Sequence, residues 1–201
     1  MNEEFGRGLL VRFCKMLYDR QITVSAGGNM SLMIDDSEIL ITPSGRNKGL
    51  LEPEDLILMG TDGSVISDGK PSIENKMHLA LYNLNPETRS VVHCHPLYCT
   101  SIAVKGKELK TELTPEGVIL LGKVPMIPYF TPGSQELVDA VAARHDSKAM
   151  LMARHGAITQ GRTVEEAYNR MEELEFQARL QTITGRAKVL PYSEIEKISR
   201  M

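Results

Sequence analysis

The chain has 201 residues, with 23 basic and 26 acidic side chains and a formal net charge of −3. Such a small and mixed charge is untypical of proteins that bind nucleic acids through a basic surface. The longest apolar run, residues 149–153, is far shorter than the roughly 20 residues that a membrane-spanning helix needs. We therefore expect one domain over residues 1–201, with neither a nucleic acid nor a membrane as its partner.

The N-terminus and the cysteines indicate the compartment. The first residues, Met-Asn-Glu-Glu-Phe, are acidic and lack the basic and apolar regions of a signal peptide. Cys14, Cys94 and Cys99 are odd in number and show no disulfide framework. Reduced thiols in a soluble cytoplasmic protein are therefore expected.

Apolar residues at helical spacing predict four helices. They are expected around residues 5–17, 77–84, 134–145 and 164–178. Thr163, with Glu166 three positions later, is the pattern of a capping box at the start of the longest helix.

Short β-prone runs separated by Gly, Pro, Asn and Asp predict the strands. They are expected at Met30–Ile34, Glu38–Thr42, Leu56–Met59, Ser90–His95, Lys123–Ile127 and Ala149–Met152. The early strands follow one another as hairpins, and the later ones alternate with helices. This order predicts an α/β fold in which helices flank a mixed sheet.

The run Val-Val-His-Cys-His-Pro at residues 91–96 is the strongest chemical signal. Side chains two residues apart on a strand point to the same face, so His93 and His95 project together and Cys94 points to the opposite layer. Two adjacent imidazoles form half of a tetrahedral zinc site. The alternative is a pair of partly exposed polar residues at a strand end.

A third imidazole would complete such a site, and His155 is the best candidate among the remaining histidines. It follows an apolar strand and precedes Gly156, where a loop can direct it into a cleft. His78 is expected on the solvated surface of a helix. His145 is expected at the C-terminus of a helix, where the helix dipole favours it.

Three short loops, at residues 25–29, 42–45 and 70–74, have the composition of anion-binding turns. The glycines of the first loop allow backbone N–H groups to approach a ligand closely, and in the third loop Ser72 is placed to cap the helix that follows. Each loop also reads as an ordinary turn, and Ser72 as a cap alone. Glu74, expected in the first turn of that helix, is either a fourth metal ligand, a general base or a residue stabilised by the dipole.

These motifs together resemble the class II aldolase/adducin family, and within it the L-fuculose-1-phosphate aldolases. The matching segments are SAGGNMS at 25–31, ITPSG at 41–45, KPSIE at 70–74, VVHCHP at 91–96 and RHG at 154–156. The resemblance implies a three-layer α/β/α domain with a mixed, largely antiparallel sheet. It also implies a homotetramer with one zinc ion in each subunit, and three imidazoles and a carboxylate accept other divalent metals as well.

The resemblance also implies roles for individual residues. His93, His95 and His155 fall on the metal ligands, and Glu74 falls on the acid/base residue that also ligates the resting metal. The positions that fall on the phosphate-binding loops are Gly28, Asn29, Ser44, Gly45, Ser72 and Ile73. Ile73 replaces a second serine, so only its backbone N–H serves a phosphate, and residues 109–121 lack the tyrosine of many family aldolases.

The implied activity is that of a class II aldolase, a lyase of carbohydrate metabolism. It would cleave a ketose 1-phosphate, such as L-fuculose 1-phosphate, to dihydroxyacetone phosphate and an aldehyde. In this scheme zinc stabilises the enediolate, and Glu74 handles its proton.

Three alternatives share parts of this pattern. A decarboxylase of a 3-oxo-tetronate 4-phosphate, or another sugar-phosphate lyase, has the same ligands and glutamate, and fold does not fix function. The family's 4-epimerases carry aspartate at the position of Glu74, which counts against that reaction. A non-catalytic, adducin-like assembly module needs no metal ligands, so the three histidines count against it.

Overall fold

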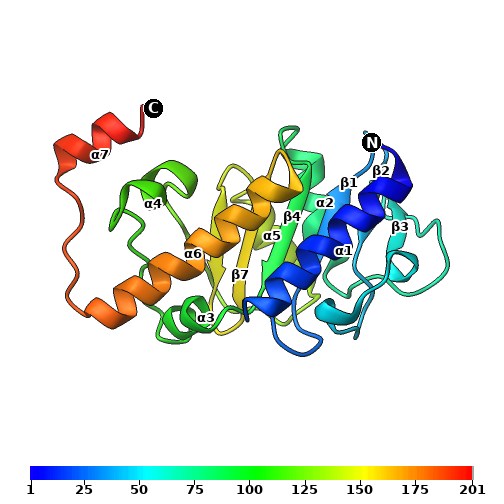
Figure 1. The fold of residues 1–201 in the computed structure, drawn as a ribbon, viewed down its shortest axis with the longest axis horizontal. Helices are drawn as coiled ribbons and strands as arrows, with labels where there is room; N and C mark the ends of the chain where they lie inside the picture. Colours follow the sequence, from blue (N-terminus) through cyan, green and yellow to red (C-terminus); the bar gives the residue numbers. More distant parts are fainter. Residues whose placement is uncertain (201) are drawn as a thin grey trace.

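The structure is a computed structural model and describes residues 1–200. It contains one seven-stranded sheet with the strand order β3-β2-β1-β4-β7-β6-β5 (Figure 1). The strands are β1 (Asn29–Met33), β2 (Glu38–Ile41), β3 (Ile57–Gly60), β4 (Ser90–Cys94), β5 (Met126–Ile127), β6 (Ala149–Met152) and β7 (Gly156–Gly161). Every pairing is antiparallel except the parallel pair β5–β6, which confirms a mixed, largely antiparallel sheet.

Helices cover both faces of this sheet. They are α1 (Glu3–Asp19), α2 (Asn75–Leu84), α3 (Leu97–Val104), α4 (Pro115–Leu120), α5 (Gln135–Ala142), α6 (Val164–Thr184) and α7 (Tyr192–Ile198), with short 3₁₀ turns at Lys48–Leu50 and Pro53–Asp55. In Figure 1, α1 and α6 cross the near face of the sheet, while α2 and α5 lie behind it. The expected three-layer α/β/α architecture is therefore confirmed. No helix within residues 1–200 combines the length and the apolar character needed to cross a bilayer.

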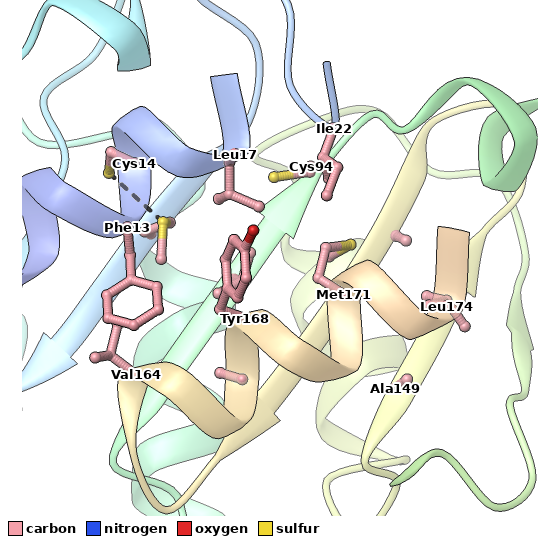
Figure 2. Close-up of a cluster of buried hydrophobic side chains, with 14 of the residues drawn as sticks. Phe13, Cys14, Leu17, Ile22, Cys94, Ala149, Val164, Tyr168, Met171 and Leu174 are labelled. Carbon is pink, nitrogen blue, oxygen red and sulfur yellow. Dashed lines mark hydrogen bonds between the residues drawn. The ribbon is translucent and has the colours of Figure 1, made fainter. Parts of the chain in front are cut away.

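Two apolar clusters, one on each face of the sheet, hold the layers together. Figure 2 shows part of the first, in which α1 and α6 pack on the strands and the rings of Phe13 and Tyr168 lie 5.2 Å apart. Cys14 of α1 reaches the sulfur of Met30 at 3.5 Å, and Cys94 of β4 points into the same layer. The second cluster joins the opposite face of the sheet to residues of α2 and α5, among them Met77, Leu81, Leu137 and Val141.

The helix starts test the predicted caps. Thr163 accepts a hydrogen bond from the backbone of Glu166 and is the N-cap of α6, as expected, and Ser134 caps α5 in the same way by accepting from Leu137. The expectation for Ser72 is wrong, because α2 begins at Asn75 and its N-cap residue is Glu74. The chain makes a separate turn before the helix, in which the Ser72 hydroxyl accepts from the Glu74 backbone at 3.3 Å.

The sequence patterns do not reveal four elements: β7, α3, α4 and α7. The strand β7 lies in the centre of the sheet between β4 and β6, and all six of its residues are buried. A strand that is covered on both faces shows no alternation of polar and apolar residues. This strand forms one wall of the site described next.

Candidate metal centre and active site

The site lies at one end of the three central strands of the sheet, where β4 ends and its neighbours β1 and β7 begin. Asn29, the first residue of β1, pairs with His93 near the end of β4. On the other side of β4, Cys94 pairs with Ala157 near the start of β7. One end of the sheet therefore brings together the SAGGN loop, the His-Cys-His segment and the turn that precedes β7.

Three imidazoles meet at this end, as the sequence predicts. His93, His95 and His155 each offer one nitrogen, and these nitrogens all lie within 4.8 Å of one another. The Nε2 atoms of His93 and His95 are 3.1 Å apart. Two nitrogens bound to a tetrahedral zinc at about 2.1 Å would be separated by about 3.4 Å, so the spacing suits a shared ion.

Backbone contacts orient two of these rings. Nδ1–H of His93 donates to the carbonyl oxygen of Ala157 at 2.8 Å, which leaves the lone pair of Nε2 directed at the other imidazoles. The ring of His95 fits between two glycines. A Cβ on Gly27 would lie 2.9 Å from its Nδ1, and one on Gly156 would lie 2.7 Å from its Cδ2. Both glycines are therefore needed for this ring to take its place.

His155 is carried by the tight turn between β6 and β7. The preceding residue, Arg154, has a φ of 56°, which is a left-handed conformation that non-glycine residues rarely adopt. Such strain is retained where the surrounding structure enforces it, often at functional sites. The turn brings the imidazole of His155 to within 5.0 Å of the His95 ring, measured between centroids.

Glu74 completes the cluster from the N-terminal end of α2. Its Oε2 lies 3.2 Å from Nε2 of His93, and its Oε1 lies 3.4 Å from Nε2 of His155. Burial acts to raise the pKa of this carboxyl, but His93, Asn29 and His155 outweigh it and hold the pKa well below its usual range. Oε1 is buried and has no hydrogen-bond partner among the described residues.

The donor set fits a divalent metal. Burial, followed by the influence of neighbouring histidines, lowers the pKa of His95 to about 3 and that of His155 to about 4, so both rings are neutral near pH 7. Neutral imidazoles and an ionised carboxylate are the forms that bind metals. Without a cation, several nitrogen lone pairs and a carboxylate would face one another in a buried space.

The three loops with the composition of anion-binding turns also meet at this end. Pro43 and Pro71 form an isolated β-bridge, and the backbone N–H of Ser72 donates to Thr42 at 3.1 Å, so the second and third loops lie side by side. The backbone N–H of Ser44 donates to Lys70, which leaves its hydroxyl as the free donor. Gly45 has open space around its α-carbon.

The first loop lies against the histidine cluster. Gly28 has a φ of +69°, and a Cβ there would lie 2.6 Å from the carbonyl oxygen of His93. The side chain of Asn29 bonds to Glu74 and His78, which leaves its backbone and the second hydrogen of its NH₂ group for an anion. Ile73, in the third loop, exposes 57% of its surface.

Sequence reasoning missed Lys48, which connects two of these loops. Its ammonium group donates to the carbonyl oxygens of Ala26 at 3.1 Å and Arg46 at 2.7 Å, while only 3% of the residue is exposed. Burial lowers the pKa of this lysine. The composition of the segment gives no hint of its burial, because lysine is mostly a surface residue.

The predictions for the two remaining histidines, His145 and His78, agree with the structure in one case and not in the other. His145 follows α5, and its Nδ1 contacts the Ala142 carbonyl at 3.0 Å, close to the helix end as expected. The expectation of a solvated His78 is wrong, because this residue is fully buried. It lies one helical turn after Glu74 and faces β1, and that spacing of four residues is the signal that could have revealed it.

Fold and site define a three-layer α/β protein with a histidine cluster at the end of its central strands. The chain belongs to the class II aldolase and adducin family, since the sequence model of the Class II Aldolase and Adducin N-terminal domain matches residues 8–182.

Relatives within this family carry two kinds of name. The 3-oxo-tetronate 4-phosphate decarboxylase of Escherichia coli strain K12 is 35% identical over 188 residues, covering 91% of this chain and 89% of the relative. The L-fuculose phosphate aldolase of Methanococcus vannielii is 38% identical over 173 residues, covering 86% of this chain and 93% of the relative. The crystal structure of Escherichia coli YgbL, described as an aldolase/epimerase/decarboxylase, matches with a TM-score of 0.94 at 34% identity over 98% of this chain and 99% of the other.

Proposed function

We propose that the protein is a metal-dependent lyase that cleaves a ketose 1-phosphate, such as L-fuculose 1-phosphate, to dihydroxyacetone phosphate and an aldehyde. The observation that carries this proposal is the convergence of three imidazoles and one carboxylate on a single point. The adjacent loops and Lys48 supply hydroxyl and cationic groups suited to a phosphate.

His93, His95 and His155 would hold the metal, with Glu74 as a further ligand while substrate is absent. A bound divalent ion, zinc by this donor set, supplies a Lewis acid for the negative charge that develops on the carbonyl oxygen of the substrate. The backbone contact of His93 and the two glycines around His95 keep their nitrogens directed at this point.

Glu74 would act as the acid/base residue. Breaking the C3–C4 bond leaves an electron pair on C3 of the three-carbon product, and this carbon must receive a proton before the product leaves. The Oε1 atom of Glu74 is buried, has no hydrogen-bond partner within residues 1–200 and lies beside His155, so it can hold that proton and deliver it.

The phosphate would occupy the space between the three loops. The hydroxyls of Ser44 and Ser72, the backbone of Gly28, Asn29, Gly45 and Ile73, and the charge of Lys48 would bind it together. A cation that is nearly excluded from water interacts more strongly with an anion than an exposed one does.

A second candidate is the decarboxylation of a 3-oxo-tetronate 4-phosphate. It is favoured by the 35% identity to the Escherichia coli decarboxylase over 91% of this chain. Loss of carbon dioxide also leaves an electron pair next to a carbonyl group, but it requires no removal of a hydroxyl proton. Many family aldolases have a tyrosine in the segment that corresponds to residues 109–121, and this reaction would not need one there.

A paired assay separates the two candidates. Purified protein with bound metal is given a panel of ketose 1-phosphates and 3-oxo acid phosphates, with and without a chelator, and the release of dihydroxyacetone phosphate or carbon dioxide is followed. Chelator-sensitive release of the triose phosphate supports the aldolase, and chelator-sensitive release of carbon dioxide supports the decarboxylase. Bound metal with neither product would refute both candidates.

Matched variants test the assigned roles. Glu74→Gln should keep the metal on its three imidazoles and lose about 100-fold or more in kcat, because the acid/base group is gone. His93→Ala should lose the metal, whereas His145→Ala, which removes a histidine outside the cluster, should keep it. Metal content by mass spectrometry provides the readout, and an unaltered metal content in His93→Ala would contradict the ligand assignment.

We also propose that the enzyme is a cytoplasmic homotetramer, as its family resemblance implies. Large apolar side chains that stay exposed in the single chain, such as Leu97, Phe176 and Ile183, provide surface for subunit contacts. Light scattering coupled to size-exclusion chromatography measures the subunit number, and a monomeric mass would contradict this proposal.

A further inference from the structure

A chain of buried polar side chains runs behind Glu74 into the protein interior. Asn29 Nδ2 lies 2.9 Å from Glu74 Oε2, and Asn29 Oδ1 lies 2.6 Å from Nε2 of His78. Nδ1 of His78 lies 2.7 Å from the Ser31 hydroxyl, which lies 2.7 Å from the Tyr82 hydroxyl. Every residue in this series of hydrogen bonds is buried, and the series links β1 to α2.

The chemistry of the groups gives the chain one direction. An ionised carboxylate can only accept, so Asn29 turns its NH₂ group to Glu74 and its carbonyl oxygen to His78. That oxygen also only accepts, and Nε2 of His78 must therefore carry the proton. The buried ring is neutral, so its Nδ1 accepts from Ser31, and Ser31 in turn accepts from Tyr82. All donors point towards Glu74.

The two oxygens of Glu74 consequently differ. Oε2 accepts a hydrogen bond from Asn29 and lies beside His93, so buried side chains fix its position. Oε1 has no hydrogen-bond partner among the described residues and lies 3.4 Å from Nε2 of His155. A carboxylate fixed through one oxygen presents the other in a single orientation.

We propose that His78 is a positioning residue that acts through Asn29 to lock Oε2 of Glu74 and thereby keeps Oε1 directed at the substrate. This inference rests on the acid/base role proposed for Glu74. Outer partners of this kind fix the geometry of a reacting group without touching substrate, and their loss typically lowers activity about 10- to 100-fold. His78 is therefore expected to affect turnover more than substrate binding.

A purely structural role for His78 predicts a different outcome. Buried polar groups need hydrogen-bond partners in any protein, and losing them lowers stability. In that case a variant would be less stable, but its folded fraction would keep the wild-type kcat. A separation of kcat from both KM and stability distinguishes the two roles.

The experiment compares two substitutions at this position. His78→Leu removes the donor to Asn29, while His78→Gln retains an NH₂ group that can donate to the same oxygen. We expect kcat to fall about 10- to 100-fold in His78→Leu, with little change in KM or in bound metal, and to recover largely in His78→Gln. Leu81→Val is the control, because it trims a fully buried residue of the same helix outside the polar chain.

Crystal structures of the metal-free variants give a readout that does not depend on turnover. The Glu74 carboxylate should keep its place in His78→Gln and shift or occupy several rotamers in His78→Leu. An unmoved Glu74, or an unchanged kcat in His78→Leu, would overturn the proposal. If the wild-type protein turns over none of the substrates, the proposed function fails instead, and the position of Glu74 in the two variants still decides whether His78 holds it.

Discussion

The buried, neutral His78 should make the metal-free protein lose stability in acid. Burial, followed by the electrostatic influence of His93, lowers the pKa of this residue from 6.5 to about 3, whereas Glu74 acts in the opposite direction. In the unfolded chain the imidazole returns to its ordinary pKa and takes up a proton below about pH 6.5. The free energy of unfolding therefore falls as the pH drops from about 6.5 towards 3, since the unfolded state binds the extra proton.

The size of this effect follows from the two pKa values. Between pH 8 and pH 4, protonation of His78 in the unfolded state alone shifts the folding equilibrium by about 2.5 powers of ten, which lowers the free energy of unfolding by about 3 kcal/mol. This is a large fraction of the 5–15 kcal/mol by which domains are typically stable. His95 and His155 act in the same direction, and so does Glu74 below the usual pKa of a carboxyl, so the wild-type loss should exceed this figure.

Urea unfolding of chelator-treated protein, followed by circular dichroism at several pH values, isolates the contribution of His78. His78→Gln cannot take up a proton, so between pH 6 and pH 4 its free energy of unfolding should fall by about 1.2 kcal/mol less per pH unit than that of the wild type. The comparison is between slopes, because the variant can also differ in overall stability. Parallel curves for the two proteins would refute the assignment of a buried neutral imidazole.

Four further outcomes are expected. Gly27→Ala should displace the His95 ring and weaken metal affinity about tenfold or more, and an unchanged zinc titration would contradict the close contact. Gly8→Ala, at an open position in α1, should stabilise the protein by about 0.5–1 kcal/mol in urea unfolding, and a loss would contradict the open site. Leu174→Ala should cost about 2–5 kcal/mol in the same measurement, because this side chain is fully buried. Lys48→Met should raise KM for a phosphorylated substrate about tenfold with bound metal unchanged, and an equal KM would remove Lys48 from phosphate binding.

Periodicity and apolar runs in the sequence predicted those helices and strands that bury one face or form an apolar run. The helix α1, the helix α6 and the strand β6 appear where periodicity and apolar runs placed them. The strand β7 escaped because it is covered on both faces, so its Gly-Ala-Ile-Thr-Gln-Gly sequence shows neither alternation nor an apolar run. The short helices α3 and α4 have few turns in which to show a period.

The same distinction holds for the site. The spacing of His93 and His95 on one strand was enough to predict that they lie together, and the turn before Gly156 indicated that His155 could join them. The burial of His78 depends on Asn29 and Ser31, which are 49 and 47 residues away in the sequence. The spacing of four residues indicates only that His78 shares a helix face with Glu74, and its polar partners become visible when β1 is placed against that face.

Cys94 stands between His93 and His95 in the sequence, yet the pleat of β4 puts its sulfur in the opposite layer. Burial raises the pKa of this thiol well above its usual range, so it stays protonated and does not act as a ligand. A metal bound by these histidines and Glu74 would meet only nitrogen and oxygen, and thiophilic ions such as copper(I) would gain nothing from the neighbouring sulfur. The alternation of side chains along β4 thus keeps the thiol away from the histidine cluster and determines which donor atoms a metal there would meet.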